Sequence, residues 1–318
     1  MQDRGFRRFP LGYLQNIRSR TLSKVLSRAY DRIDVSGRLS DIFADPQKLY
    51  EWWWPYKAIR RRVFRQLNPS VSVVIATKNN EATIEGALRS LMAQTIRNIE
   101  IIVVNDASSD QTGEIAERLA EQDNRIQVLH NEVSEGTGAS RNRGMNAAKG
   151  KYITFQDGDD YSLPTRLEMQ VDAFKESDGI KIVLCNYVRI TSDGTTLQIN
   201  KNRVMKCIIS MMFLRDEVLA RVGGFLSESI SEDSDFYERI KITYGSDCER
   251  IVFRTLYHAL FRPESSFFSQ TTIQYFDGKK VKYKKQPAAI EHWENIRSSH
   301  GKMRDIMGSN EEPNVAGQ

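Results

Sequence analysis

Short runs of β-branched residues alternate with amphipathic stretches in the middle of this chain. The segment VSVVIAT at residues 71–77 is apolar almost throughout, as is typical of a strand buried on both faces of a sheet. Three further runs of this kind predict strands at residues 99–106, 126–131 and 151–157. Apolar residues at helical spacing predict helices between them, at residues 83–93, 112–122 and 140–150. This alternation predicts an α/β fold with a mostly parallel central sheet flanked by helices, whose strand carboxyl ends form one ligand-binding edge.

The pattern changes after Pro164. A helix at residues 166–174 is followed by two strands that pair across a Ser-Asp-Gly turn. The elements predicted from there on are strands at 180–191, 195–200, 206–214 and 251–261, and helices at 215–222 and 231–245. Ser231 or a neighbour is the expected N-cap of the last helix. The tail after about residue 301 is polar, contains Gly and Pro, and is predicted to be disordered.

Composition narrows the class of protein. The chain has 318 residues, 40% of them hydrophobic, which is enough for a sizeable core. No apolar stretch approaches about 18 residues, so no transmembrane helix is readable, and the basic start lacks the apolar region of a secretory signal. Cys185, Cys207 and Cys248 form no CxxC pair. Unpaired cysteines suit a reducing compartment, so we expect a cytoplasmic location.

The net charge of +5 is unevenly distributed along the chain. Residues 1–68 form a basic extension rich in Trp and Arg, predicted to be helical, with a net charge of +9. Residues 69–277 carry a net charge of −7, and residues 278–318 form a basic C-terminal extension with +3. An acidic middle argues against a nucleic-acid partner for the main domain and fits a site that holds a metal cation.

Three carboxylates follow the predicted strand at 151–157, in the segment Phe155-Gln-Asp-Gly-Asp-Asp160. Carboxylates this close raise one another's pKa unless a cation or hydrogen-bond donors compensate. Aspartate oxygens are suited to Mg²⁺ or Mn²⁺, whereas the spacing of a calcium loop is absent. A solvated acidic turn is the alternative interpretation, since Asp-Gly is common in turns.

Other polar segments lie where the predicted edge of the sheet would gather them. The acidic pair Glu232-Asp233 begins a helix, where a carboxylate acts either as a general base or only as a cap. The turns at 76–79 and 105–108 follow the first two strands, and a single Asp there either binds a nucleotide or caps a turn. The dinucleotide fingerprint GxGxxG fails, because Arg141 stands at its third glycine. His258, in an apolar strand, is interpreted as a packed histidine.

The order of these segments resembles glycosyltransferase family 2, whose members have the GT-A fold. The resemblance runs from about residue 70 to 262. It rests on the strings at 71–112 and 140–168, on RVGGF at 221–225, and on SEDSDFYERI at 231–240. It implies a Rossmann-like, mostly parallel sheet at residues 69–277 and inverting transfer of a sugar from a nucleotide-diphosphate donor.

The resemblance also implies roles for the acidic residues. The DxD motif of the family falls on Asp157-Gly158-Asp159, which places Asp157 on the ribose side and assigns Asp159 to the metal, Mn²⁺ or Mg²⁺. Asp106 matches a position that reads uracil in many members, so a UDP-sugar is the expected donor. The ED motif falls on Glu232-Asp233, and Asp233 matches the catalytic base.

The remaining matches are donor-binding positions. Thr77 belongs to the first nucleotide loop, and Lys78 stands where many members have Tyr, so we expect it to contact a phosphate or a base edge instead. Arg141 and Arg166 match recurrent basic positions, although Arg166 also fits a structural role. Arg262 matches a late basic residue that approaches the diphosphate.

The expected partners are the donor and a glycan or lipid-linked acceptor in cell-surface polysaccharide synthesis. Three alternatives remain open: a metal-dependent nucleotidyltransferase, although ATKNN lacks that class's glycines, a non-catalytic sugar-nucleotide or glycan-binding relative, and a nucleic-acid-binding protein that uses the basic ends, which would require salt-sensitive binding by those ends alone. The aromatic and basic segments 49–65 and 277–286 predict peripheral docking on an anionic membrane surface. Alternatively, the Trp run packs under the main domain and the basic residues form a solvated face.

Overall fold

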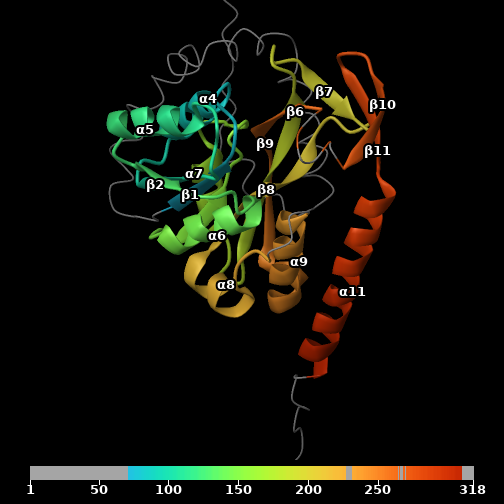
Figure 1. The fold of residues 1–318 in the computed structure, drawn as a ribbon. Helices are drawn as coiled ribbons and strands as arrows, with labels where there is room; N and C mark the ends of the chain where they lie inside the picture. Colours follow the sequence, from blue (N-terminus) through green and yellow to red (C-terminus); the bar gives the residue numbers. More distant parts are fainter. Residues whose placement is uncertain (1–70, 227–230, 264, 266–267, 269, 310–318) are drawn as a thin grey trace, which may run out of the picture.

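The computed structural model describes residues 71–226, 231–263, 265, 268 and 270–309. At its centre lies one mixed sheet in which β3, β2, β1 and β4 are parallel neighbours (Figure 1). In that order the strands span Ile126–His130, Ile99–Asn105, Val71–Thr77 and Tyr152–Phe155. All four coincide with strands predicted from the sequence. The predicted α/β fold is therefore confirmed.

The sheet continues beyond β4 with antiparallel strands. β8 (Met205–Leu214) lies antiparallel to β4 and to β6 (Ile182–Ile190), and β9 (Glu249–Leu260) runs parallel to β6. The predicted pairing across the Ser-Asp-Gly turn is confirmed by β6 and β7 (Thr196–Ile199). The outer strands are β11 (Lys280–Lys285), parallel to β7, and β10 (Thr271–Phe276). The two-residue strand β5 (Tyr161–Ser162) pairs with β9.

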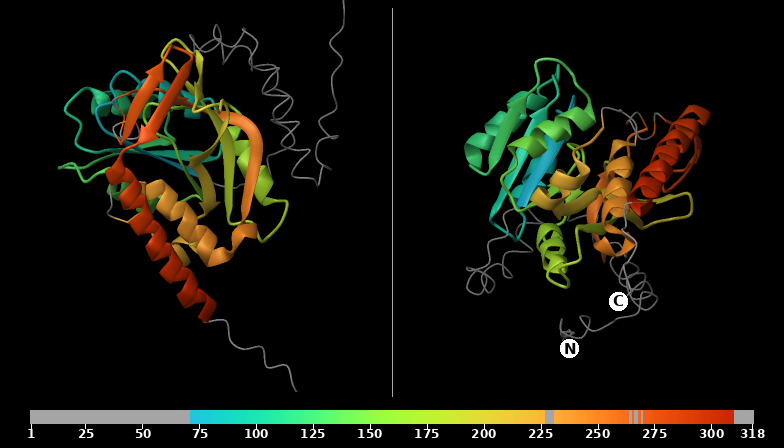
Figure 2. Two further views of the ribbon diagram at one scale, coloured as in Figure 1. Left: turned by 90° about the vertical axis from the view of Figure 1, so that its right-hand side faces the viewer. Right: turned by 90° about the horizontal axis from the view of Figure 1, so that it is seen from below.

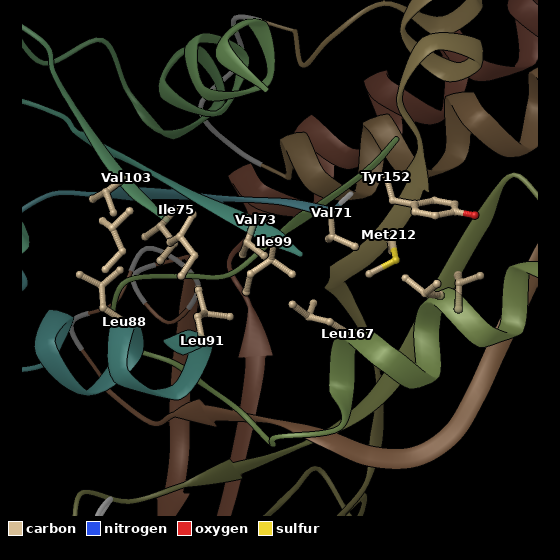
Figure 3. Packing of buried hydrophobic residues seen from close by; sticks show 14 of the residues in the cluster. Val71, Val73, Ile75, Leu88, Leu91, Ile99, Val103, Tyr152, Leu167 and Met212 are labelled. Atoms are coloured by element: carbon tan, nitrogen blue, oxygen red, sulfur yellow. The ribbon is translucent and has the colours of Figure 1, made fainter. Parts of the chain in front are cut away.

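Helices cover both faces of the sheet. One face carries α4 (Ile84–Met92), α5 (Thr112–Gln122) and α7 (Arg166–Phe174), and the other carries α6 (Thr137–Ala147), α8 (Arg215–Val222) and α9 (Glu232–Tyr244). Side chains along β1 point alternately to the two faces of the sheet, which explains the two hydrophobic layers. Val73 and Ile75 pack with Leu88 in the first layer, as Figure 3 shows, while Val74 packs in the second. Each fully buried aliphatic side chain contributes about 1.5–3 kcal/mol.

A long C-terminal helix, α11 (Pro287–Ser309), runs beside α9 (Figure 2). The prediction of a disordered tail after about residue 301 is therefore wrong for residues 301–309, and residues 310–318 lie outside the described residues. The predicted start of the C-terminal extension at residue 278 falls in the turn between β10 and β11. The extension 1–68, with its segment 49–65, also lies outside the described residues.

Helix ends differ from the sequence prediction in two places. Helix α6 spans Thr137–Ala147, so it both begins and ends three residues earlier than the predicted 140–150, and it directly follows Gly136, which has a left-handed conformation (φ 89°). Ser231 occupies the predicted N-cap position of α9, but its side chain makes no capping hydrogen bond; its backbone is left-handed, with φ 60°, and its carbonyl accepts the Asp235 amide. Within the described ranges, no helix has the length and apolar character needed to cross a membrane.

Candidate active site

Two loops at the carboxyl ends of β1 and β2 are tied together by hydrogen bonds. The Asn79 amide donates to Ser108 Oγ at 3.0 Å, and Asn79 Oδ1 accepts the Ser109 amide at 2.9 Å. Asn79 and Ala107 both have φ of 52°, in the left-handed region. Residues held in this way cost on the order of 1–3 kcal/mol each and cluster at functional sites. The loops are thus held in one defined shape at the ligand edge of the sheet.

Asp106 lies buried behind these loops and anchors the segment 131–136. Its Oδ1 accepts Asn131 Nδ2 at 2.7 Å and the Glu135 amide at 2.8 Å, and its Oδ2 accepts Ser134 Oγ at 2.8 Å and the Gly136 amide at 3.0 Å. Burial alone would raise the pKa of Asp106, but these four donors lower it to about 2. The carboxylate is ionised and its acceptor sites are used within the chain. Uracil could contact Asp106 only if it replaced one of these four donors, so this contact stays a prediction.

The two predicted donor-loop residues surround Asp106. The exposed Lys78 donates from Nζ to Ser134 Oγ at 2.9 Å, and this hydroxyl in turn donates to Asp106. The Thr77 carbonyl accepts the Asp106 amide at 2.9 Å, and Thr77 Oγ1 accepts Asn80 Nδ2 at 2.9 Å. Thr77, Lys78 and Asp106 therefore lie in one hydrogen-bonded unit, as their predicted shared role requires.

Asp157, Asp159 and Asp160 form a cluster of carboxylates after β4. Each offers one oxygen, and these three oxygens lie within 4.8 Å of one another. Burial and then the Asp157 charge raise the pKa of Asp159, while burial and then the Asp159 charge raise the pKa of Asp160 well above its usual range. A set of three carboxylates with only oxygen ligands fits a Mg²⁺ or Mn²⁺ ion. Asp160 was missed as a candidate ligand, although the third carboxylate of the motif was the signal for it.

Two arginines pair with this cluster. Arg141 Nη2 lies 2.9 Å from Asp157 Oδ1, and its Nη1 lies 2.7 Å from Glu232 Oε1. Arg262 Nη2 lies 2.6 Å from Asp159 Oδ2. Arg141 is only 5% exposed, so its charge is buried and depends on these carboxylates. One guanidinium thus joins the DxD segment to the ED segment, which lie far apart in the sequence.

Asp233 occupies the first turn of α9, next to Glu232. It is half-buried, and its Oδ1 accepts the Ser234 amide at 2.7 Å. Burial raises the pKa of Asp233, and the positive charge of Arg141 opposes that rise. A carboxylate with a raised pKa is a stronger base. The geometry therefore suits the predicted catalytic base.

The RVGGF segment fixes the helix that carries Arg141. Asn142 donates from Nδ2 to the Phe225 carbonyl and accepts the Phe225 amide, both at 2.8 Å. A Cβ on Gly224 would lie 2.4 Å from Asn142 Oδ1, so only glycine fits this approach. The Phe225 ring packs under the Arg141 guanidinium, 5.5 Å from its centroid. Asn142 was missed in the sequence, because nothing there indicates its partner.

Arg166 and His258 lie behind the site. Arg166 is fully buried and donates to Thr154 Oγ1, Ser162 Oγ and the Phe155 carbonyl at 2.6–2.8 Å. It therefore holds β4 to the following segment, which is the structural role. His258 is buried in β9, and burial lowers its pKa to about 4, so it is neutral near pH 7.

Comparisons with known proteins agree with this geometry. The family model described as Glycosyl transferase family 2 matches residues 72–261. EpsH of Bacillus subtilis (strain 168), named as a glycosyltransferase, is 43% identical over 130 residues, 41% of this chain and 37% of that protein. UDP-Glc:alpha-D-GlcNAc-diphosphoundecaprenol beta-1,3-glucosyltransferase WfaP of Escherichia coli is 37% identical over 117 residues, 37% of this chain and 45% of that protein. The matches thus span less than half the length of these relatives.

Among solved structures, S. aureus TarS 1-349 in complex with UDP-GlcNAc has a TM-score of 0.52 and 22% identity. The match covers 64% of this chain and 62% of TarS, and it shows that the two share the GT-A fold. The family match, in turn, covers more than half of the chain and includes both the DxD and the ED segments. The chain belongs to glycosyltransferase family 2.

Proposed function

We propose that this protein is an inverting glycosyltransferase that moves a sugar from a nucleotide-diphosphate donor to a hydroxyl of a glycan or lipid-linked acceptor. The observation that carries the proposal is the bridge made by Arg141. It brings Asp157 of the donor segment and Glu232, next to Asp233, to the two ends of one guanidinium. A transferase needs its donor-binding group and its base this close, because the acceptor oxygen attacks the anomeric carbon in line.

In this mechanism Asp233 accepts the proton of the acceptor hydroxyl while the oxygen forms the new glycosidic bond. The bond from the anomeric carbon to the diphosphate breaks, and the nucleoside diphosphate leaves with the electron pair. Asp157, Asp159 and Asp160 are the residues that would hold Mg²⁺ or Mn²⁺, which supplies Lewis-acid stabilisation of the leaving group when bound. Arg262, next to Asp159, places a further positive charge on the leaving-group side.

Relatives support the choice of donor and acceptor classes. The printed name of WfaP gives a UDP-sugar donor and a diphosphoundecaprenol-linked acceptor, and TarS has been solved with UDP and with UDP-GlcNAc. We therefore propose a UDP-sugar donor and an acceptor that belongs to cell-surface polysaccharide synthesis. A cytoplasmic location, and membrane docking through residues 49–65 and 277–286, stay predictions of the sequence. Co-sedimentation with anionic vesicles, with and without residues 1–67, tests the docking; equal binding of both forms would contradict a role for 49–65.

A donor panel tests the proposal. The full chain is incubated with UDP-, GDP- and dTDP-sugars in Mn²⁺ or Mg²⁺, and released nucleoside diphosphate is measured. We expect slow metal-dependent release from one UDP-sugar, and Asp233→Asn is expected to abolish transfer while UDP still binds. If Asp233→Asn instead lost UDP affinity and kept its turnover, Asp233 would not be the base.

The same assay separates two of the alternatives. A nucleotidyltransferase would make pyrophosphate from a nucleoside triphosphate and a sugar phosphate, so pyrophosphate release is measured in parallel. A binding relative would retain the UDP-sugar without turnover under any of these conditions. Either result would overturn the proposed function.

A further inference from the structure

A groove lies on the outer end of the sheet, over β7, β11 and β10. It encloses a cavity of about 530 Å³. Its lining includes Lys201, Lys280, Lys282 and Lys284, with Gln198 and Tyr275 among the other residues. No carboxylate is among the described residues that line it. The groove therefore offers positive charge, amide groups and an aromatic ring to whatever binds there.

The strand register explains why the lysines gather. Lys280, Lys282 and Lys284 alternate along β11, so their side chains share one face at intervals of about 7 Å. Gln198 is the partner of Lys280 on β7, and Tyr275 is the partner of Lys282 on β10. The row of lysines therefore runs along the middle of a three-stranded surface, with polar and aromatic groups on either side.

Lys282 and Lys284 have no carboxylate partner within the part of the chain that the structure describes, whereas the charge of Asp277 acts on Lys280, and Asp277 accepts the Lys280 amide at 2.6 Å and the Tyr275 hydroxyl at 2.8 Å. None of Lys280, Lys282 and Lys284 forms an ion pair there, whereas Lys175 and Lys181 pair with carboxylates at 2.8 and 2.7 Å. Like charges about 7 Å apart repel one another. A row of like charges of this kind is stabilised by an anionic ligand with repeated charges.

The shape of the surface favours a carbohydrate chain over a flat bilayer. A flat bilayer contacts protruding side chains and not the floor of a hollow; Phe276, at the end of β10, is 46% exposed, and its ring also packs against Phe261, with centroids 5.1 Å apart. A hollow lined by Gln198 and Tyr275 supplies instead the hydrogen bonds and the flat ring that a sugar chain uses. Tyr275 is 52% exposed, so its ring is accessible.

One hydrophobic cluster links the strand beneath the groove to the donor site. Val281 of β11 shares a hydrophobic cluster with Phe261, and Phe261 is followed by Arg262, which pairs with Asp159. A chain bound in the groove is therefore held on a rigid support that reaches the metal-binding carboxylates. This placement is what a site for the growing acceptor requires.

We propose that this groove binds an acidic carbohydrate chain, one that carries phosphate or carboxylate groups, and holds it as the acceptor of the reaction. The assignment as acceptor rests on the proposed function. Binding of the chain itself does not, because it is measured without any donor.

The test measures binding of the full protein to alginate, to a phosphomannan and to neutral dextran, at two salt concentrations. We expect salt-sensitive binding to at least one acidic glycan and none to dextran. The variant K280Q/K282Q/K284Q should weaken that binding about tenfold or more, because it removes three contacts with the anionic chain. A matched control, K149Q/K175Q/K302Q, removes the same charge elsewhere and should bind as the wild type does.

Several results would overturn the proposal. The first is that the control variant loses as much glycan affinity as K280Q/K282Q/K284Q. The second is that dextran binds as tightly as the acidic glycans, or that neither acidic glycan binds. The third is that phosphatidylglycerol vesicles or single-stranded DNA bind more tightly than the acidic glycans. Tyr275→Ala provides a second variant that leaves the charge unchanged and should also weaken glycan binding. Donor turnover without any glycan is assayed separately and should be unchanged in K280Q/K282Q/K284Q. A failure of the proposed function is therefore distinguished from a failure of the groove.

Discussion

Gly158 provides a strict steric test of the candidate site. It lies between Asp157 and Asp159, and its backbone does not adopt the left-handed conformation that favours glycine. A Cβ there would instead lie 2.5 Å from Thr77 Oγ1 and 2.9 Å from Asn80 Nδ2. Glycine is thus required because the DxD segment packs directly on the first nucleotide loop. The substitution Gly158→Ala should push these two segments apart.

The magnitude follows from the packing. Insertion of one methyl group into a close contact costs typically about 1–3 kcal/mol. If the loops separate to relieve about 2 kcal/mol, and donor binding has to close them again, UDP affinity falls about 30-fold, since 1.4 kcal/mol corresponds to a factor of ten. If they stay in place, the same energy lowers the melting temperature by roughly 4–8 °C for a domain of this size. Calorimetric titration of UDP with Mn²⁺, together with thermal unfolding, measures both.

Two other glycines serve as controls. A Cβ on Gly144 would lie 2.4 Å from Val74 Cγ1 in the core, so Gly144→Ala should lower the melting temperature with a smaller effect on UDP affinity. Gly301 in α11 has nothing within 4 Å of such a Cβ, so Gly301→Ala should stabilise the helix by up to about 1 kcal/mol. Thr77→Ala in the Gly158→Ala background removes the nearest clash and should recover part of the loss. If Gly158→Ala kept the UDP affinity and the melting temperature of the wild type, the close contact between Gly158 and Thr77 would be refuted.

Three further predictions concern titratable groups. Asp233 must be ionised to accept a proton, and burial raises its pKa above the ordinary 3.8. The rate of transfer should therefore fall as the pH is lowered, with a midpoint above pH 3.8. A midpoint below pH 3.8 would contradict the role of Asp233 as the base. Asp160→Asn keeps an acceptor for the Leu260 amide and removes the carboxyl group. Because the pKa of this carboxyl is raised in the folded protein, its ionisation above pH 3.8 destabilises the folded state. The substitution should therefore raise the melting temperature in EDTA and reduce the stabilisation by Mn²⁺, and a loss of stability in EDTA would argue against it. His300→Leu removes the 2.8 Å contact to Asp235 Oδ1 and should destabilise the protein by about 1–3 kcal/mol, whereas His300→Gln, which keeps a donor, should recover part of it in thermal unfolding.

The parallel half of the sheet could be predicted from the sequence because its signals are local. Each of its strands is an apolar run, and each helix between them has its own amphipathic stripe. Strand β5 has only two residues and gains its partner β9 about a hundred residues later, so no local pattern indicates it. Helix α11 was missed for a related reason. Its buried residues, Ala289, Ile296 and His300, form one narrow stripe on an otherwise polar helix.

In the candidate site, too, local features could be predicted from the sequence and long-range contacts could not. The resemblance to glycosyltransferase family 2 assigned roles to Asp157, Asp159 and Asp233, and these roles stay predictions. Their partners were not readable, since Arg141 reaches Glu232 across 91 positions of sequence. The donors that satisfy Asp106 come from the loop after β3, and a hydrogen bond formed by a backbone amide leaves no mark on composition.

The acidic charge of residues 69–277 acquires a more specific meaning from these contacts. The sequence associated it with a metal cation, yet within the described residues two of the DxD carboxylates already pair with arginines, at 2.9 and 2.6 Å. Those arginines differ in what they join. Arg262 follows β9 and, among the described residues, forms an ion pair with the donor segment, whereas Arg141 pairs with the donor segment and with the helix of the predicted base. Because a buried guanidinium needs nearby carboxylates to offset its desolvation, Arg141 holds the ED helix and the DxD segment together through carboxylates that belong to the proposed active site.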